Sequence, residues 1–177
     1  KCRASLFDVN FRDVRLEIVF GELSEPTENG KDEICFMISK NPGLPMRPLA
    51  SVASGGELSR IMLAIKAVMA DKDAVETLIF DEIDTGISGR TAQKVSERLA
   101  CIAKKRQVIA ITHLPQIAAM ADAHYLIEKT SDSNSTISNI YLLTEEESIK
   151  ELARMLGGVR ITDAVLQNAR EMSTLAK

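Results

Sequence analysis

Two short apolar runs, residues 77–80 (TLIF) and 107–112 (QVIAIT), constrain the fold of this chain more than any other feature. Each run has the length and composition of a buried strand. The segment between them, residues 89–104, has apolar side chains at three- and four-residue steps and therefore predicts a helix. The apolar face of that helix consists of Ala92, Val95, Leu99 and Ile102. A strand, a helix and a strand in this order imply a parallel sheet covered by helices, in which ligands bind outside the carboxyl ends of the strands.

The rest of the chain predicts hairpins and helices around this parallel core. Thr144 and Glu147 stand three residues apart and form a capping box at the start of a helix. The expected strands are residues 11–20 and 33–39, joined by a polar loop at 21–32, and residues 124–130 and 136–143; the expected helices are residues 115–121, 145–156 and a last one from about Thr162. The predicted fold class is α/β, with a mostly parallel sheet flanked by helices and with antiparallel hairpins.

Two adjacent glycines lie at the start of the helix before the first buried strand, in the stretch VASGGELSR at residues 52–60. Ser54 and Glu57 form a capping box there. The residues expected on the apolar face of this helix are Leu58, Ile61, Met62, Ile65, Val68 and Met69. Gly55 and Gly56 need another explanation, because a glycine inside a helix costs about 1 kcal/mol relative to alanine. A helix N-terminus attracts anions, and glycine lets a phosphate approach the backbone. We favour this phosphate-binding role over a capped helix with incidental glycines.

Ionisable side chains follow both buried strands. An apolar strand that ends in an aspartate, here Asp81, matches a Walker B motif, in which the aspartate holds Mg²⁺. Glu82 can polarise an attacking water in the same site only if the chain leaves the strand after Asp81, since successive strand residues face opposite ways. Residues 84–86 (DTG) are expected to supply the bend. His113 can hydrogen-bond a γ-phosphate or order the water. Taken singly, the acids also fit a solvated strand end, and the histidine also fits a structural role.

The composition narrows the class of protein. Apolar residues make up 45% of the 177 residues, enough for a core, and the net charge of −3 argues against a wholly basic surface while leaving a local basic patch open. The three cysteines form no C-x-x-C pair and no histidine is near them, so we expect no zinc site and a reducing, cytoplasmic setting. We find no signal peptide and no apolar run of membrane-spanning length. The chain opens with Lys1, which is compatible with a fragment.

The three motifs together resemble the ABC-type ATPases. Residues 54–57 match the signature motif, with glutamate in place of the glutamine that is common in transporters, and His113 matches the switch histidine. Asp81 and Glu82 match the Walker B aspartate and the catalytic glutamate. Residues 41–158 are similar to the SMC-like branch of this family, which acts in bacterial DNA repair. The stretches that carry this resemblance are PLASVASGGELSRIMLAIK, TLIFDEIDTGISGRTA, VIAITHLPQIAAMADAHYLIEK and ELARMLGG.

The resemblance implies a nucleotide site completed by a second head. In the family, the signature helix of one head caps the γ-phosphate that the Walker A loop of another head holds. It implies ATP and Mg²⁺ as cofactors. The residue roles it implies are nucleotide binding by Ser54, Gly55, Gly56 and Glu57, Mg²⁺ binding by Asp81, water activation by Glu82, and sensing of the γ-phosphate by His113. On this basis we expect Gly56→Asp to block head engagement and to leave the fold intact, because an acidic residue suits the first turn of a helix.

Two departures from the family pattern define what this chain lacks. The aspartate usual in the D-loop is replaced by Ser88, and no G-x-x-x-x-G-K-[ST] motif is present. The chain therefore resembles the C-terminal half of an ABC-type ATPase head. Its expected segments are residues 1–46 (hairpin and connection), 47–158 (signature, Walker B and histidine core) and 159–177 (last helix). The partners this implies are the N-terminal Walker A half of the same protein, a second head in a homodimer, and DNA with double-strand-break ends, at the nucleoid in the cytoplasm and without a membrane.

Two other functions stay open at this point. An ABC ATPase subunit of another branch, such as a transporter, is disfavoured by Glu57 and Ser88. A non-catalytic interaction module is disfavoured by the intact set of motif residues.

Overall fold

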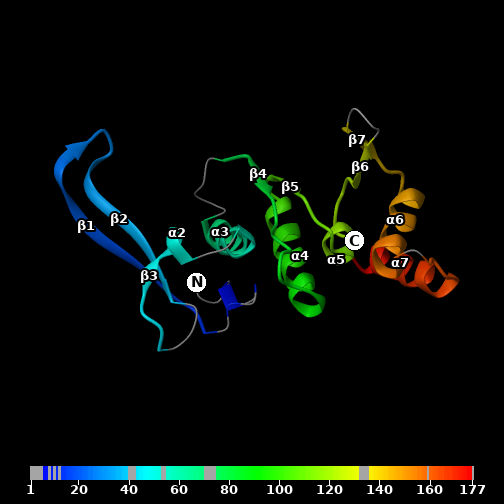
Figure 1. Ribbon diagram of the computed structural model, residues 1–177, viewed down its shortest axis with the longest axis horizontal. Helices are drawn as coiled ribbons and strands as arrows, with labels where there is room; N and C mark the ends of the chain where they lie inside the picture. The colour runs from blue at the N-terminus through cyan, green and yellow to red at the C-terminus, as the bar shows by residue number, and fades with distance from the viewer. Residues whose placement is uncertain are drawn as a thin grey trace. The chain divides into compact units, whose positions relative to one another are not determined.

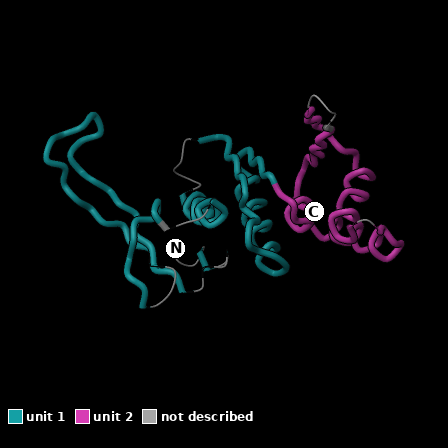
Figure 2. The backbone as a smooth tube through the Cα atoms, viewed as in Figure 1, with its two compact units in different colours: residues 1–111 teal, residues 112–177 magenta. Residues whose placement is uncertain are grey.

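The computed structural model describes residues 6–7, 9, 11, 13–39, 43–52, 55–69, 75–131, 136–158 and 160–176. The chain divides into two compact units, residues 1–111 and residues 112–177 (Figure 2). The α/β class is confirmed, because the described elements combine a parallel strand pair with antiparallel sheets and helices. The expected three-segment division stays a prediction.

An antiparallel sheet of β1 (Arg15–Thr27), β2 (Gly30–Ser39) and β3 (Arg47–Pro48) begins the first unit (Figure 1). The hairpin is confirmed, but the expected loop at 21–32 is wrong, because strand pairing continues to Thr27 and Gly30. A tight turn closes the hairpin: the Thr27 hydroxyl accepts a hydrogen bond from the Asn29 backbone N–H (3.2 Å) and donates one to the Gly30 carbonyl (3.0 Å). Gly30 has φ of 102°, which glycine adopts at no steric cost.

The parallel core of the first unit consists of β4 (Thr77–Phe80) and β5 (Gln107–Ala110), joined through α4 (Gly89–Ala103). Both strands and the helix are confirmed, although β5 ends two residues earlier than expected. The four residues predicted for the apolar face of α4 are all buried. β4 and β5 form the whole of this sheet within the described part of the chain.

The helix that follows the short α2 (Leu49–Val52) is α3 (Gly55–Met69), as predicted, but its buried face differs from the expectation. Of the six residues predicted to share an apolar face, only Ile61 is fully buried, and Leu58, Met62 and Met69 are exposed. The buried residues of α3 are Gly56, Arg60, Ile61, Leu63 and Ala64. Apolar side chains surround much of this helix, so periodicity alone selected the wrong side.

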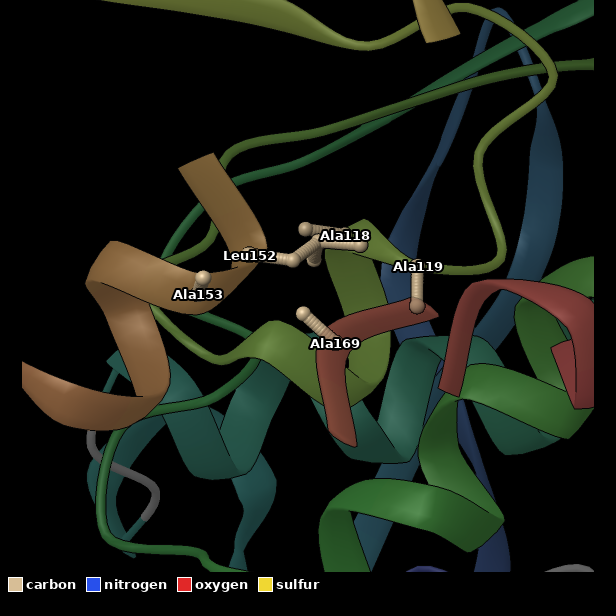
Figure 3. Close-up of a cluster of buried hydrophobic side chains, with 5 residues drawn as sticks. All are labelled: Ala118, Ala119, Leu152, Ala153 and Ala169. Atoms are coloured by element: carbon tan, nitrogen blue, oxygen red, sulfur yellow. The ribbon is translucent and has the colours of Figure 1, made fainter. Parts of the chain in front are cut away.

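The second unit contains α5 (Pro115–Ala118), the hairpin of β6 (Tyr125–Ser131) and β7 (Thr136–Leu142), α6 (Glu145–Gly157) and α7 (Asp163–Ala176). These elements agree with the sequence prediction, except that the helix expected at 115–121 ends at Ala118. Small side chains dominate the core, which lets the helices approach closely. Figure 3 shows its five buried members, Ala118, Ala119, Leu152, Ala153 and Ala169.

The capping box at the start of α6 gives a prediction for stability. The Thr144 hydroxyl accepts from the Glu147 N–H (3.3 Å), and the Glu147 carboxylate accepts from the Thr144 N–H (2.8 Å). Hydrogen bonds from the Thr144 backbone and hydroxyl lower the pKa of Glu147 below its ordinary value of 4.5. The folded state thus favours the carboxylate, so this stabilisation is present at neutral pH and is lost as the pH falls from 4.5 through the lowered pKa.

We expect Thr144→Ala to lower the free energy of unfolding at pH 7 by about 1 kcal/mol. Glu147→Gln should reduce the loss of stability on acidification. Urea unfolding at neutral and acidic pH, followed by circular dichroism, measures both effects. An acid dependence of Glu147→Gln equal to that of the wild type would contradict the proposed linkage.

Candidate functional site

The chain leaves β4 at Phe80, and the segment that follows places two carboxylates on an irregular turn. Asp81 and Glu82 are both exposed, and the Glu82 N–H donates to Asp81 Oδ1 (2.9 Å). Glu82 has φ of 56°, in the left-handed region that side-chain-bearing residues rarely adopt. The Thr85 N–H then donates to the Glu82 carbonyl (3.1 Å). The expectation that the chain leaves the strand near Asp81 is confirmed, but the bend begins at Glu82 and precedes the DTG stretch.

The first turn of α3 packs directly against this turn, and the packing explains why Gly56 is a glycine. A Cβ on Gly55 would lie 2.5 Å from Glu82 Oε2. A Cβ on Gly56 would lie 2.6 Å from the Glu82 carbonyl oxygen and 2.8 Å from Thr85 Cβ. At Gly56 the bare backbone is thus required by a contact within the same chain, whereas a Cβ at Gly55 would displace only the end of the Glu82 side chain. The expectation that Gly56→Asp leaves the fold intact is wrong, because its Cβ would collide with backbone. The phosphate-binding role stays a prediction.

Two polar side chains of α3 donate hydrogen bonds to backbone carbonyls of the turn. The Ser59 hydroxyl donates to the Asp81 carbonyl (2.9 Å). Arg60 Nη1 donates to the carbonyls of Ile83 (3.2 Å) and Thr85 (2.8 Å). These bonds satisfy backbone carbonyls that leave regular strand structure, where such groups otherwise lack partners.

Arg60 is the functional candidate that sequence reasoning missed. Its side chain is 6% exposed, and its guanidinium carbon lies 5.9 Å from the centre of the Phe11 ring. Burial lowers the pKa of Arg60 from its ordinary value, and the negative charges of Glu57 and Asp84 oppose that shift. An arginine four residues after Gly56 lies on the same helix face. That spacing was the available signal for a buried partner of the turn.

The remaining predicted site residues are placed less closely. Ser54 lies outside the described residues, so the capping box of Ser54 with Glu57 stays a prediction. Glu57 is half-buried in the first turn of α3. Ser88 is exposed at the N-cap of α4, where its carbonyl accepts from the Thr91 N–H (3.2 Å). His113 is exposed. It follows β5 in the sequence but belongs to the second unit, whereas Asp81 and Glu82 belong to the first. The structure thus brings together Gly55, Gly56, Asp81 and Glu82.

The carboxylates that follow β4 suit a metal ion whose other ligands are waters and the phosphates of a bound molecule. Within the described ranges, no three His, Cys, Asp or Glu side chains are grouped as a metal site. Mg²⁺ is commonly held by one or two carboxylates together with waters and substrate phosphates. The exposed Asp81 carboxylate, with Oδ1 already accepting from Glu82, fits that kind of site.

A search of family models gives no match for this chain. The DNA repair protein RecN of Bacillus subtilis is 42% identical in an alignment of 174 residues that covers 95% of this chain and 30% of that protein. The DNA repair protein RecN of Halalkalibacterium halodurans is 45% identical in an alignment of 164 residues that covers 90% of this chain and 29% of that protein. The chain is thus similar to one segment of RecN. It spans about 30% of the length of these relatives.

Solved structures with the same fold are SMC heads. The Smc head domain of Pyrococcus yayanosii, solved with a coiled coil and joint, matches with a TM-score of 0.58 at 19% identity, over 85% of this chain and 27% of that one. The RecN-like segment therefore has the fold of an SMC head. Among the described residues, no helix combines the length and apolar character needed to cross a bilayer.

Proposed function

We propose that this RecN-like segment is the C-terminal half of an ABC-type ATPase head that acts in repair of DNA double-strand breaks. The observation that carries the proposal is the packing of Gly55 and Gly56 against Glu82, since it joins the signature-like start of α3 to the two carboxylates after β4. The family name of the relatives supports DNA repair as the process. The same relatives disfavour a transporter subunit.

The residues have complementary tasks in this proposal. Ser54, Gly55, Gly56 and Glu57 face the γ-phosphate of an ATP that a second head presents. Asp81 binds Mg²⁺, which when bound neutralises charge on the phosphates. Glu82 takes up the proton of the attacking water, and His113 senses the γ-phosphate. ATP binding then drives two heads together, and hydrolysis releases them to let the protein handle DNA ends in the cytoplasm, at the nucleoid.

An exposed apolar face of the two parallel strands supports the proposal that the other half of an ATPase head packs there. Leu78 and Phe80 of β4 are buried, but Ile79, which points to the other face, is 67% exposed. Ile79 pairs with Ile109 of β5, which is also exposed, as is Ile111 just beyond it. Parallel sheets are normally covered on both faces. We infer that the N-terminal Walker A half of the same protein covers this face.

Ile79→Lys tests this inference in a chimera in which residues 1–177 replace the matched segment of Bacillus subtilis RecN. Because Ile79 is already exposed in this chain, the substitution should change the unfolding free energy of the isolated chain by less than about 0.5 kcal/mol. In the chimera it should lower ATP turnover about tenfold or more, since it would bury an unpaired charge at the new contact. The matched control is Ile79→Val. Full turnover by the Ile79→Lys chimera would refute a Walker A half on this face.

A further inference from the structure

Three hydrogen bonds from α3 hold the carbonyls on both sides of Glu82. Ser59 binds the carbonyl before Glu82, and Arg60 binds the first and third carbonyls after it. Both bonds of Arg60 start from the same nitrogen, Nη1, which therefore ties Ile83 to Thr85. The turn is fixed at its backbone, while the Glu82 side chain itself is exposed.

Glu82 depends on these hydrogen bonds more than an ordinary surface residue does, because its backbone conformation is unusual. A left-handed φ of 56° at a residue with a side chain persists only where the surroundings over-determine it. The backbone at Glu82 sets the direction in which its carboxylate leaves the chain. In the observed conformation the carboxylate lies beside Gly55, where a Cβ would collide with Oε2. A relaxed turn would aim the carboxylate elsewhere.

Arg60 is well suited to enforce this conformation. Arg60 is almost fully buried, and its guanidinium carbon lies 5.9 Å from the centre of the Phe11 ring, so the ring also restricts the position of the group. A planar, buried guanidinium loses little freedom when it forms its hydrogen bonds. A lysine at this position would carry the same charge but ends about one bond earlier and has no planar fork.

We propose that Arg60 is a positioning residue that holds Glu82 in the orientation needed for ATP hydrolysis. This inference rests on the proposed function of Glu82 as the group that activates water. Arg60 does not touch the nucleotide in this scheme and acts through the carbonyls of Ile83 and Thr85. Ser59 assists through the carbonyl of Asp81.

The test uses Arg60→Lys in the RecN chimera, with the exposed Arg170→Lys of α7 as a matched control. We expect Arg60→Lys to lower kcat about 10- to 100-fold, because small displacements of a catalytic group have effects of that size. The KM for ATP should change less than about twofold, since phosphate binding is not altered. Arg170→Lys should change neither value. A kcat of Arg60→Lys within twofold of the wild type overturns the proposal.

A double substitution separates positioning from general structural damage. If Arg60 acts only through Glu82, Arg60→Lys should cause no further fall of single-turnover hydrolysis in a Glu82→Gln background. The same fold-decrease in both backgrounds overturns the proposal. Ser59→Ala, which removes one weaker hydrogen bond and leaves the buried guanidinium, should show a smaller decrease with the same non-additivity and keeps the test valid if Arg60→Lys folds poorly. Unchanged hydrolysis by Glu82→Gln alone would instead refute the proposed function.

Discussion

Glu82→Gln in the RecN chimera should lower ATP turnover about 100-fold or more while ATP still holds two heads together. The amide keeps the size of the carboxylate but cannot take up a proton from water. The side chain is exposed at the end of β4, so the substitution should leave folding unchanged. Turnover is measured by phosphate release, and association by light scattering with and without ATP.

The neighbouring carboxylate supplies the control for this result. Asp81→Asn should weaken Mg²⁺ binding and reduce ATP-driven association, because the proposed metal ligand loses its negative charge. Glu82→Gln should retain association for longer than the wild type does. If Glu82→Gln heads separate as fast as wild-type heads in ATP, Glu82 is not the group that activates water.

Gly56→Asp should destabilise the first unit as well as abolish head engagement. The new Cβ would lie 2.6 Å from the Glu82 carbonyl oxygen and 2.8 Å from Thr85 Cβ, so α3 and the turn would have to separate. Overpacking of this kind costs about 1–3 kcal/mol, and the carboxylate adds repulsion toward Glu82. Urea unfolding of the isolated chain measures this cost.

Gly55→Ala is the matched control for this prediction. Its Cβ would meet only the end of the flexible Glu82 side chain, which can rotate away. We therefore expect the unfolding free energy of Gly55→Ala to stay within about 0.5 kcal/mol of wild type. Equal stability of Gly56→Asp and wild type would contradict the packing account of Gly56.

The sequence predicted elements wherever one local signal dominated. The apolar run before Asp81 located β4, and Thr144 with Glu147 located the start of α6. The hairpin turn is shorter than predicted. The polar residues at 21–32 were interpreted as a loop, although the strands of an exposed hairpin need no apolar face there. The pairing of Thr27 with Gly30 and the local hydrogen bonds of Thr27 identify the tight turn.

The sequence predicted the residues of the candidate site but not their contacts within this chain. Asp81, Glu82, Gly55 and Gly56 lie together, whereas the motifs implied only that the glycines meet a phosphate from a second head. Arg60 escaped notice because a charged residue is usually assigned to the solvent, and periodicity selected the face of Leu58 and Met62 instead. The buried Arg60 is paired with backbone carbonyls, and a sequence pattern does not reveal such partners.

The most direct measurement is ATP turnover by the isolated 177-residue chain beside turnover by the RecN chimera, each with and without Glu82→Gln. Phosphoryl transfer requires the phosphates to be held and their charge neutralised, and a Walker A half supplies much of both. The account predicts that the isolated chain does not turn over ATP above its Glu82→Gln variant, whereas the chimera does and loses this activity with Glu82→Gln. Steady turnover by the isolated chain that Glu82→Gln abolishes, or a chimera without turnover, would contradict the assignment of this chain as half of an ATPase head.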